Sequence, residues 1–261
     1  MDLGIKGKTA LVFGASGGLG GAIAQSLARE GVHVAIAGRN SAALDELAKS
    51  IVGLGVRCMP LVWDLGNLAA IGENFALIEK ELGSVDILIN NTGGPPPSPV
   101  EGVDDQLWLA QFQSMVLSVL KITDRALPGM RARKWGRIVT STSSGVLAPI
   151  PNLGVSNTLR SALIGWSKTL AREVAADGIT ANVVLPGRIA TARIGQLDAA
   201  RAMREKIDVT QVVSESLATI PVGRYGDPAE YGDAVAFLAS ARASYITGSI
   251  HRIDGGYISH I

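Results

Sequence analysis

The amino-acid sequence predicts an α/β protein: one domain built on a doubly wound parallel sheet with helices on both faces. Short β-rich apolar runs alternate with stretches of helical periodicity along most of the chain, and this alternation is typical of right-handed βαβ units. The length of 261 residues suits one such sheet. A glycine-rich turn at residues 14–20 directly follows the first predicted strand.

Strands are predicted where apolar, β-branched residues cluster, at residues 9–13, 33–37, 85–89, 137–140 and 180–185. Residues 57–62 and 249–253 are weaker strand candidates. Helices are predicted from a 3.6-residue periodicity over residues 20–30, 41–54, 67–82, 104–130 and 155–176. No internal repeat or low-complexity linker interrupts this order. Residues 1–261 are therefore expected to form a single domain.

One segment departs from the alternation. Residues 188–221 follow a predicted strand and mix polar and apolar residues with helical character. An insertion of this length at the end of a strand is typical of a functional loop. We expect it to be a lid or lobe over the substrate, not a second domain.

Composition narrows the classes of function. The chain has 24 basic and 23 acidic residues, a balance that leaves no electrostatic footprint for nucleic acid or an anionic membrane. No apolar run is long enough to span a bilayer, and the N-terminus lacks the apolar core of a secretion signal. The single cysteine, Cys58, excludes an internal disulfide and suits a reducing compartment. A cytoplasmic location is expected.

The turn after the first strand has the composition of a phosphate cradle. Gly14, Gly18 and Gly20 permit a tight turn and a close approach of the backbone to a pyrophosphate, which the following helix N-terminus favours. Leu19 lies within the same turn. A glycine pattern alone is weak, but its position directly after the first strand indicates a dinucleotide site.

The end of the second strand indicates which dinucleotide. A carboxylate at this place usually binds the ribose 2′-hydroxyl of NAD, whereas this chain has Arg39, whose guanidinium can grip a 2′-phosphate and stack on adenine. The alternative is that Arg39 only solvates a strand end. Ser16 and Asn40 are further candidate phosphate contacts. The cofactor predicted is NADP(H).

Several further motifs follow in a fixed order along the chain: Asp64-Leu65, Asn90-Asn91-Thr92-Gly93, Leu185-Pro186-Gly187-Arg188-Ile189-Ala190-Thr191, Val222-Gly223-Arg224 and Asp254-Gly255-Gly256. Together with the glycine turn, they make the chain resemble the short-chain dehydrogenase/reductase family, in particular its 3-oxoacyl-carrier-protein reductase-like members. The resemblance runs from about residue 7 to residue 257. Phe13 stands where the family usually has threonine.

The resemblance implies a Rossmann sheet of seven strands and a homotetramer in which the fourth and fifth helices form one interface. It also implies cofactor contacts from the adenine-side pair Asp64-Leu65, from Asn91 and Gly93, and from the nicotinamide segment. In that segment the residues concerned are Pro186, Gly187, Ile189 and Thr191. The apolar pattern over residues 108–120 suits either the tetramer contact or an ordinary core-facing helix surface.

Members of the family carry an Asn-Ser-Tyr-Lys tetrad, and this chain keeps one of the four. Ser143 occupies the serine position, with Ser141 and Ser144 leaving the register open. Thirteen residues further on stands Ser156 instead of tyrosine, and Arg160 stands at the lysine position. Met115 falls at the asparagine position. No shift of alignment supplies the tyrosine, because Tyr225 is the first in the sequence.

These replacements change the chemistry that the site can perform. A serine hydroxyl ionises far less readily than a phenol with a pKa of about 10, so Ser156 cannot imitate a tuned tyrosine. Arg160 can still hold ribose hydroxyls, but it is not a proton shuttle near neutral pH. Loss of acid–base assistance typically costs roughly 10² to 10⁴ in rate. Ser143, Ser156 and Arg160 remain the candidate catalytic residues, with a water held by Ser156 as one route for the proton.

Other segments are candidates for the substrate pocket. Arg188 can polarise a carbonyl or bind a substrate carboxylate, or it can be a solvated loop cation. The proline run at residues 95–99 is either a pocket wall or a rigid connector, and Val146, Leu147 and Ile150 suggest a small-molecule substrate with an apolar body. The three histidines form no constellation, so no metal site is predicted.

Three functions fit these residues. The first is an NADP(H)-dependent oxidoreductase that interconverts a carbonyl and an alcohol with non-standard proton delivery. The second is a catalytically silent NADP-binding sensor or partner subunit. The third is a lyase or isomerase that reuses the pocket, because a fold alone does not select the chemistry of its site.

Overall fold

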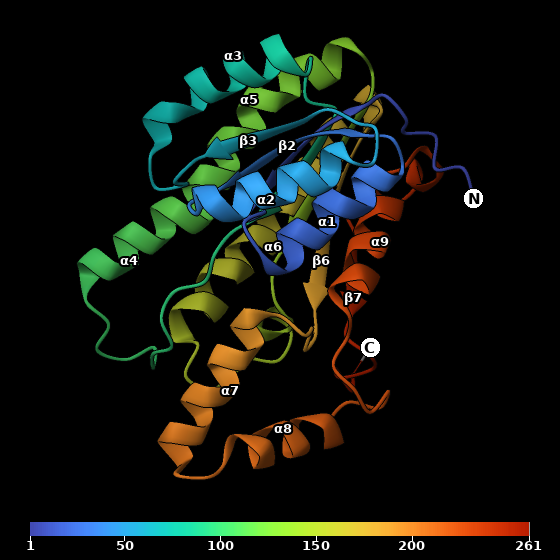
Figure 1. Ribbon diagram of the computed structural model, residues 1–261. Helices are drawn as coiled ribbons and strands as arrows, with labels where there is room; N and C mark the ends of the chain where they lie inside the picture. The colour runs from blue at the N-terminus through green and yellow to red at the C-terminus, as the bar shows by residue number, and fades with distance from the viewer. Residues whose placement is uncertain (261) are drawn as a thin grey trace.

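A seven-stranded, fully parallel sheet forms the centre of the molecule (Figure 1), in a computed structural model that describes residues 1–260. The strand order is β3-β2-β1-β4-β5-β6-β7. The strands are β1 (Thr9–Phe13), β2 (His33–Gly38), β3 (Cys58–Val62), β4 (Ile87–Asn91), β5 (Gly136–Ser141), β6 (Ile179–Pro186) and β7 (Ile250–Ile253). The predicted doubly wound fold is confirmed, and every predicted strand is present.

Helices cover both faces of the sheet in two layers. On one face α1 (Gly18–Arg29), α2 (Ser41–Val52) and α9 (Pro228–Leu238) share one apolar core with the central strands. On the other face α3 (Ile71–Glu81), α5 (Ser118–Ala132) and α6 (Gly154–Val174) share a second core. The central strands β1 and β5 are buried along their whole length. Burial on both faces is why β1 reads as a nearly continuous apolar run without alternation, whereas β5 also buries polar side chains, among them Arg137.

The helix predicted over residues 104–130 is divided in the structure. It consists of α4 (Asp105–Phe112), a π-helical turn (Gln113–Leu117) and α5, which ends at Ala132. The Asp104 carboxylate caps α4 by accepting hydrogen bonds from the amides of Gln106 and Leu107. The π-helical turn buries Met115 against α6. Such turns are frequent at functional sites, and this turn carries Met115, the residue that the resemblance aligns with an asparagine.

Helix α9 was not predicted, although its start signal is strong. Asp227 and Glu230 form a capping box around Pro228 at the first helical turn. The helix lies directly on α1, with Gly232 against the backbone of Ala22. Its periodicity is obscured because it is apolar on most sides, as expected of a helix that is buried between a sheet and a neighbouring helix.

Residues 188–221 form two helices, α7 (Ala192–Glu205) and α8 (Val209–Ala218). Figure 1 shows both of them beyond the end of the sheet, apart from the two helical layers. They follow β6, so they lie at the edge where the parallel strands have their carboxyl ends. No helix within residues 1–260 is long and apolar enough to cross a membrane.

Candidate active site

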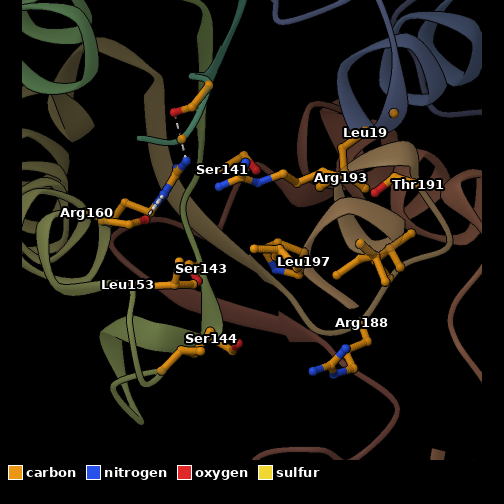
Figure 2. Close-up of a pocket in the computed structure, with 18 of the residues that line it drawn as sticks. Leu19, Ser141, Ser143, Ser144, Leu153, Arg160, Arg188, Thr191, Arg193 and Leu197 are labelled. Atoms are coloured by element: carbon orange, nitrogen blue, oxygen red, sulfur yellow. Dashed lines mark hydrogen bonds between the residues drawn. The ribbon is translucent and has the colours of Figure 1, made fainter. Parts of the chain in front are cut away.

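A cavity of about 570 Å³ opens at the carboxyl edge of the sheet. Its walls come from the ends of β1, β4, β5 and β6, from the start of α6 and from α7. The strand order reverses between β1 and β4, and ligands of doubly wound sheets bind at this switch point. Figure 2 shows side chains from these separate segments converging on one space.

The turn after β1 has the shape of a phosphate cradle. Gly14 has a φ of +63°, and a Cβ there would lie 2.6 Å from the Asn91 side-chain nitrogen and 2.7 Å from the Asn91 carbonyl oxygen. Gly20 packs against the Gly14 carbonyl, so a Cβ there would collide with the turn itself. Glycine is required at both places, and the resulting turn brings Gly14, Gly18 and Leu19 to the cavity wall. These residues fit a pyrophosphate.

Of the residues predicted to contact the adenine side of the cofactor, some line the cavity and others do not. Arg39 lines the cavity and has an exposed side chain. Asn40 instead caps α2 by accepting a hydrogen bond from the Ala43 amide, 3.2 Å away. Ser16 packs beside Gly38 at the end of β2. The Asp64 carboxylate accepts a hydrogen bond from the Gly66 amide, and neither Asp64 nor Leu65 lines the cavity.

The other predicted cofactor contacts lie together. Asn91 and Gly93 reach the cavity from the end of β4, and the Asn91 amide donates to the Phe13 carbonyl, 3.2 Å away, which ties the two central strand ends together. The resemblance also predicts that a segment that begins at the end of β6 contacts the nicotinamide. Its four predicted residues line the cavity: Pro186, Gly187, Ile189 and Thr191. A cofactor bound across the switch point would touch both groups.

The structure distinguishes the three serines at the end of β5. The Ser141 hydroxyl is 2.8 Å from the hydroxyl of Tyr231, a buried residue of α9. Ser144 begins a short 3₁₀ turn and is buried. All three serines line the cavity, and Ser143 is the least buried of them. The Ser143 hydroxyl oxygen accepts a hydrogen bond from the Gly145 amide, 3.1 Å away. The hydroxyl proton of Ser143 is therefore left to point toward a ligand.

Ser156 and Arg160 lie one turn apart on the inner face of α6. The Arg160 guanidinium donates to the Ser156 hydroxyl at 3.2 Å and to the carbonyls of Thr92 and Gly93 at 3.3 and 3.0 Å. Burial, together with the charge of Arg193, lowers the pKa of Arg160 to about 10. The guanidinium is therefore still charged at neutral pH, and it fixes the orientation of Ser156.

Arg188 lines the cavity, but it is paired with a carboxylate rather than being a free cation. Its guanidinium is 2.7 Å from the carboxylate of Asp198, which is 3% exposed, and it lies over the ring of Tyr225. The Tyr225 hydroxyl donates to the same carboxylate. Figure 2 shows Arg188 directed away from Arg160. The ion pair joins the segment after β6 to α7, and Asp198 neutralises most of the Arg188 charge that a substrate would otherwise meet.

Arg193 and Tyr257 are among the cavity residues that the sequence did not single out. Arg193, in the first turn of α7, extends across the cavity and donates to the Pro95 carbonyl at 3.1 Å. Tyr257 lines the cavity from the segment after β7. The signal for Arg193 was its place two residues after Thr191, within the lobe that was already expected to cover the site.

The proline run forms part of the wall. Ser98 pairs with Leu153 through an isolated β-bridge, and hydrogen bonds of 2.8 and 3.0 Å join this segment to the loop before α6. Pro97, Ile150 and Leu153 line the cavity, whereas Val146 and Leu147 do not. Leu197 of α7 also lines the cavity, and Figure 2 shows it across the cavity from Leu153. One region of the cavity is therefore apolar.

No group of three or more His, Cys, Asp or Glu side chains that could hold a metal ion occurs within residues 1–260. The charged residues of the cavity wall are arginines. The cavity lies at the switch point of the sheet and combines a glycine cradle with serines at the end of β5. These features are typical of the class of dinucleotide-dependent α/β oxidoreductases.

Comparison with known proteins agrees with this class. A family model described as enoyl-(acyl carrier protein) reductase matches residues 14–258. The chain is 31% identical to the D-beta-hydroxybutyrate dehydrogenase of Cupriavidus necator, with 98% of this chain and 99% of that protein covered. It is 36% identical to the 3-oxoacyl-(acyl-carrier-protein) reductase of Salmonella typhimurium, with 96% and 97% covered.

A solved structure gives the same result. The L-sorbose reductase of Gluconobacter frateurii, in complex with NADPH and L-sorbose, superposes with a TM-score of 0.94 at 30% identity, and all of both chains is covered. The chain belongs to the short-chain dehydrogenase/reductase family, and it is an oxidoreductase of that type.

Proposed function

We propose that this protein is an NADP(H)-dependent reductase that interconverts a carbonyl and an alcohol in a small molecule, and that it delivers the proton without the family's tyrosine. The observation that carries the proposal is the single cavity that joins the glycine cradle to Ser143 and Ser156. The similarity to an NADPH-bound sugar reductase and to 3-oxoacyl reductases supports it.

The residues of this chain fit the cofactor. The Gly14 cradle excludes a side chain and suits the pyrophosphate, Arg39 suits the 2′-phosphate, and residues 186–191 suit the carboxamide. Arg160 would hold the ribose. When bound, NADPH supplies the hydride, and the protein contributes orientation and electrostatics.

The chain's own groups then handle the oxygen and the proton. Ser143 donates a hydrogen bond to the carbonyl oxygen, since its own oxygen is already engaged by the Gly145 amide. Ser156 is held by Arg160 and positions a water that gives a proton to the developing alkoxide; the hydroxide left behind takes up a proton from bulk solvent. The positive charge of Arg160 also stabilises that alkoxide. This route replaces a tuned phenol by a positioned water next to a buried cation.

We further propose a domain organisation, a substrate type, a location and an oligomeric state for the protein. Residues 1–261 act as one domain, with residues 188–221 as the substrate lid, because α7 forms one wall of the cavity. The apolar wall at Pro97, Ile150 and Leu153 suits a substrate with an apolar body. The protein acts as a cytoplasmic homotetramer and binds neither nucleic acid nor membrane.

The first experiment is a titration of purified protein with NADPH and NADH, followed by a panel of carbonyl compounds watched for NADPH oxidation. We expect tight NADPH binding and measurable turnover. The variant Ser143→Ala is expected to lower kcat by roughly 10² to 10⁴ without changing NADPH affinity. Ser161→Ala, on the exposed side of α6, is the control. Unchanged turnover in Ser143→Ala would refute the assigned role.

One alternative has a specific observation in its favour. Ser156 and Arg160 stand at the two positions where the family has its proton donor and its lysine, so a cofactor-binding sensor or partner subunit without turnover is the second candidate. Tight NADPH binding with no oxidation of any carbonyl compound would select it. A product formed from the panel without any change in NADPH would indicate a lyase or isomerase.

A further inference from the structure

The proposed reaction gives roles to Arg39 and Arg160 but none to Arg193, which also lines the cavity. Among the residues that the structure describes, the charged lining of the cavity consists of arginines alone: Arg39, Arg160, Arg188, Arg193, Arg201 and Arg204. Three of these are neutralised, because Arg188 pairs with Asp198, Arg201 with Glu205 and Glu215, and Arg204 with Glu205. Within residues 1–260, Arg39, Arg160 and Arg193 form no ion pair with a carboxylate.

Two of the unneutralised arginines meet at one point. A Cβ on Gly94 would lie 3.3 Å from an Nη of Arg193 and 3.7 Å from an Nη of Arg160. Figure 2 shows the two guanidinium groups pointing toward one another from opposite sides of the cavity, Arg160 from α6 and Arg193 from α7. The absence of a side chain at Gly94 leaves this space open.

Both guanidinium groups keep donors for a ligand. Arg193 uses one nitrogen on the Pro95 carbonyl, and Arg160 uses two on Ser156, Thr92 and Gly93. The remaining N–H groups have no protein acceptor within residues 1–260. A guanidinium presents five donors in a rigid fork that matches an oxyanion. Two such forks that face each other without a counter-charge form a site for a carboxylate or phosphate.

The pair formed by Arg160 and Arg193 lies away from the predicted positions of the cofactor phosphates. The cradle at Gly14 and Leu19 lies on the other side of the cavity from Arg160, as Figure 2 shows for Leu19. Arg39, at the end of β2, is the residue that suits the 2′-phosphate. Ser143 lies on the same side of the cavity as Arg160 (Figure 2). The oxyanion is therefore on the substrate side.

We propose that the substrate carries a carboxylate close to its carbonyl, and that Arg193 binds this carboxylate beside the positive charge of Arg160 while Ser143 binds the carbonyl oxygen. The inference rests on the proposed function and narrows its substrate class to oxo acids with an apolar body. The apolar body packs on Pro97 and Leu153. Arg193 is then a binding residue that sets specificity, and the paired Arg188 is not.

The test measures binding rather than turnover. Protein saturated with NADP⁺, which has no hydride to give, is titrated by calorimetry with 2-oxo-4-phenylbutanoate and with its methyl ester. The acid is expected to bind about tenfold to a hundredfold more tightly than the ester, the range typical of hydrogen bonds to a charged group. Arg193→Met should reduce this preference to less than about twofold and leave NADP⁺ affinity unchanged.

Arg204→Met is the matched control, because it removes the same charge from the same helix at a site already paired with Glu205, and it should keep the preference. Equal binding of acid and ester, no binding of the acid, or a preference that survives Arg193→Met would each overturn the inference. Loss of NADP⁺ affinity in Arg193→Met would assign the oxyanion to the cofactor. Failure of the wild type to bind NADP⁺ would instead refute the proposed function.

Discussion

Ser156 and Arg160, one helical turn apart on α6, are joined by a hydrogen bond of 3.2 Å at the cavity wall. Arg160 is 8% exposed, and its hydrogen bonds to two carbonyls hold the guanidinium against Ser156. A buried cation without a carboxylate partner is costly, and an anionic ligand bound beside Arg160 would offset that cost. The pKa of about 10 keeps Arg160 protonated throughout the physiological range.

Arg39 leads to a prediction about cofactor choice. Its exposed guanidinium at the end of β2 suits a 2′-phosphate, and a charge-assisted contact of this kind is worth about 1.5–3 kcal/mol. Arg39→Ser is therefore expected to weaken NADPH binding by about tenfold to a hundredfold. NADH, which lacks the phosphate, is the internal control, and its affinity should change less than about threefold. Equal losses for the two cofactors in fluorescence titrations would contradict the assignment.

Cys58 leads to a prediction about reactivity. Burial raises the pKa of its thiol to about 12, whereas a free cysteine has a pKa of about 8.5. Since the thiolate is the reactive form, Cys58 in the folded protein should react with iodoacetamide at pH 8 at least about 100-fold more slowly than free cysteine. In guanidinium chloride the rate should return to that of a free thiol. Rapid labelling of the folded protein would show that the thiol is more accessible than the structure indicates.

At the scale of elements, three glycines allow neighbouring helices and strands to pack closely. Gly14 and Gly20 bring α1 against the end of β1, and Gly232 brings α9 against α1. The two approaches are linked, because α1 takes part in both. The position of the phosphate cradle therefore depends on α9, an element that does not itself line the cavity.

This packing leads to a prediction about stability. A Cβ on Gly232 would lie 2.6 Å from the Ala22 carbonyl oxygen and from the Ser26 hydroxyl. Gly232→Ala is therefore expected to lower the free energy of unfolding by about 1–3 kcal/mol, the usual cost of overpacking.

Gly72→Ala in α3 is the control, because no atom lies within 4 Å of its added Cβ. Because alanine favours a helix more than glycine does, Gly72→Ala should leave the free energy of unfolding unchanged or raise it by up to about 1 kcal/mol. Urea denaturation followed by circular dichroism measures both variants. Equal midpoints for the two variants would show that α9 moves away from α1 at little cost.

At the scale of the whole molecule, the surface of α4 is the place to look for assembly. The apolar residues over 108–120 were predicted to form either a tetramer contact or a core-facing helix surface. Met115, Val116 and Val119 are buried against α6 and belong to the core. Leu109 and Phe112 are 62% and 42% exposed and are available for a contact between subunits. Exposed apolar side chains next to each other on one helix mark an interaction surface.

We expect this surface to take part in the proposed homotetramer. The double variant Leu109→Asp and Phe112→Asp should lower the mass measured by sedimentation, since charges are depleted at the centres of such interfaces, while the far-ultraviolet circular dichroism stays unchanged. Lys121→Asp, a polar position on α5, is the control. A wild-type protein that sediments as a monomer, or a variant that stays tetrameric, would contradict the prediction.

Much of the fold could be predicted because its determinants are local. The apolar runs of β1 and β6, the glycine turn and the periodicity of α6 depend on residues close together in the chain. The division of the helix over residues 104–130 and the existence of α9 could not be predicted in this way. Both depend on packing against elements far away in the sequence.

The sequence by itself determined the parallel sheet, the cradle at Gly14 and the lack of a tyrosine before Tyr225, because each is a matter of residue type and order. Only the tertiary structure decided that Arg193 faces Arg160 while Arg188 is paired with Asp198, and that Ser141 is paired with Tyr231. The partners in these contacts come from different elements. The charge that a ligand meets depends on which arginines are neutralised, and neutralisation is a property of distance in the folded chain.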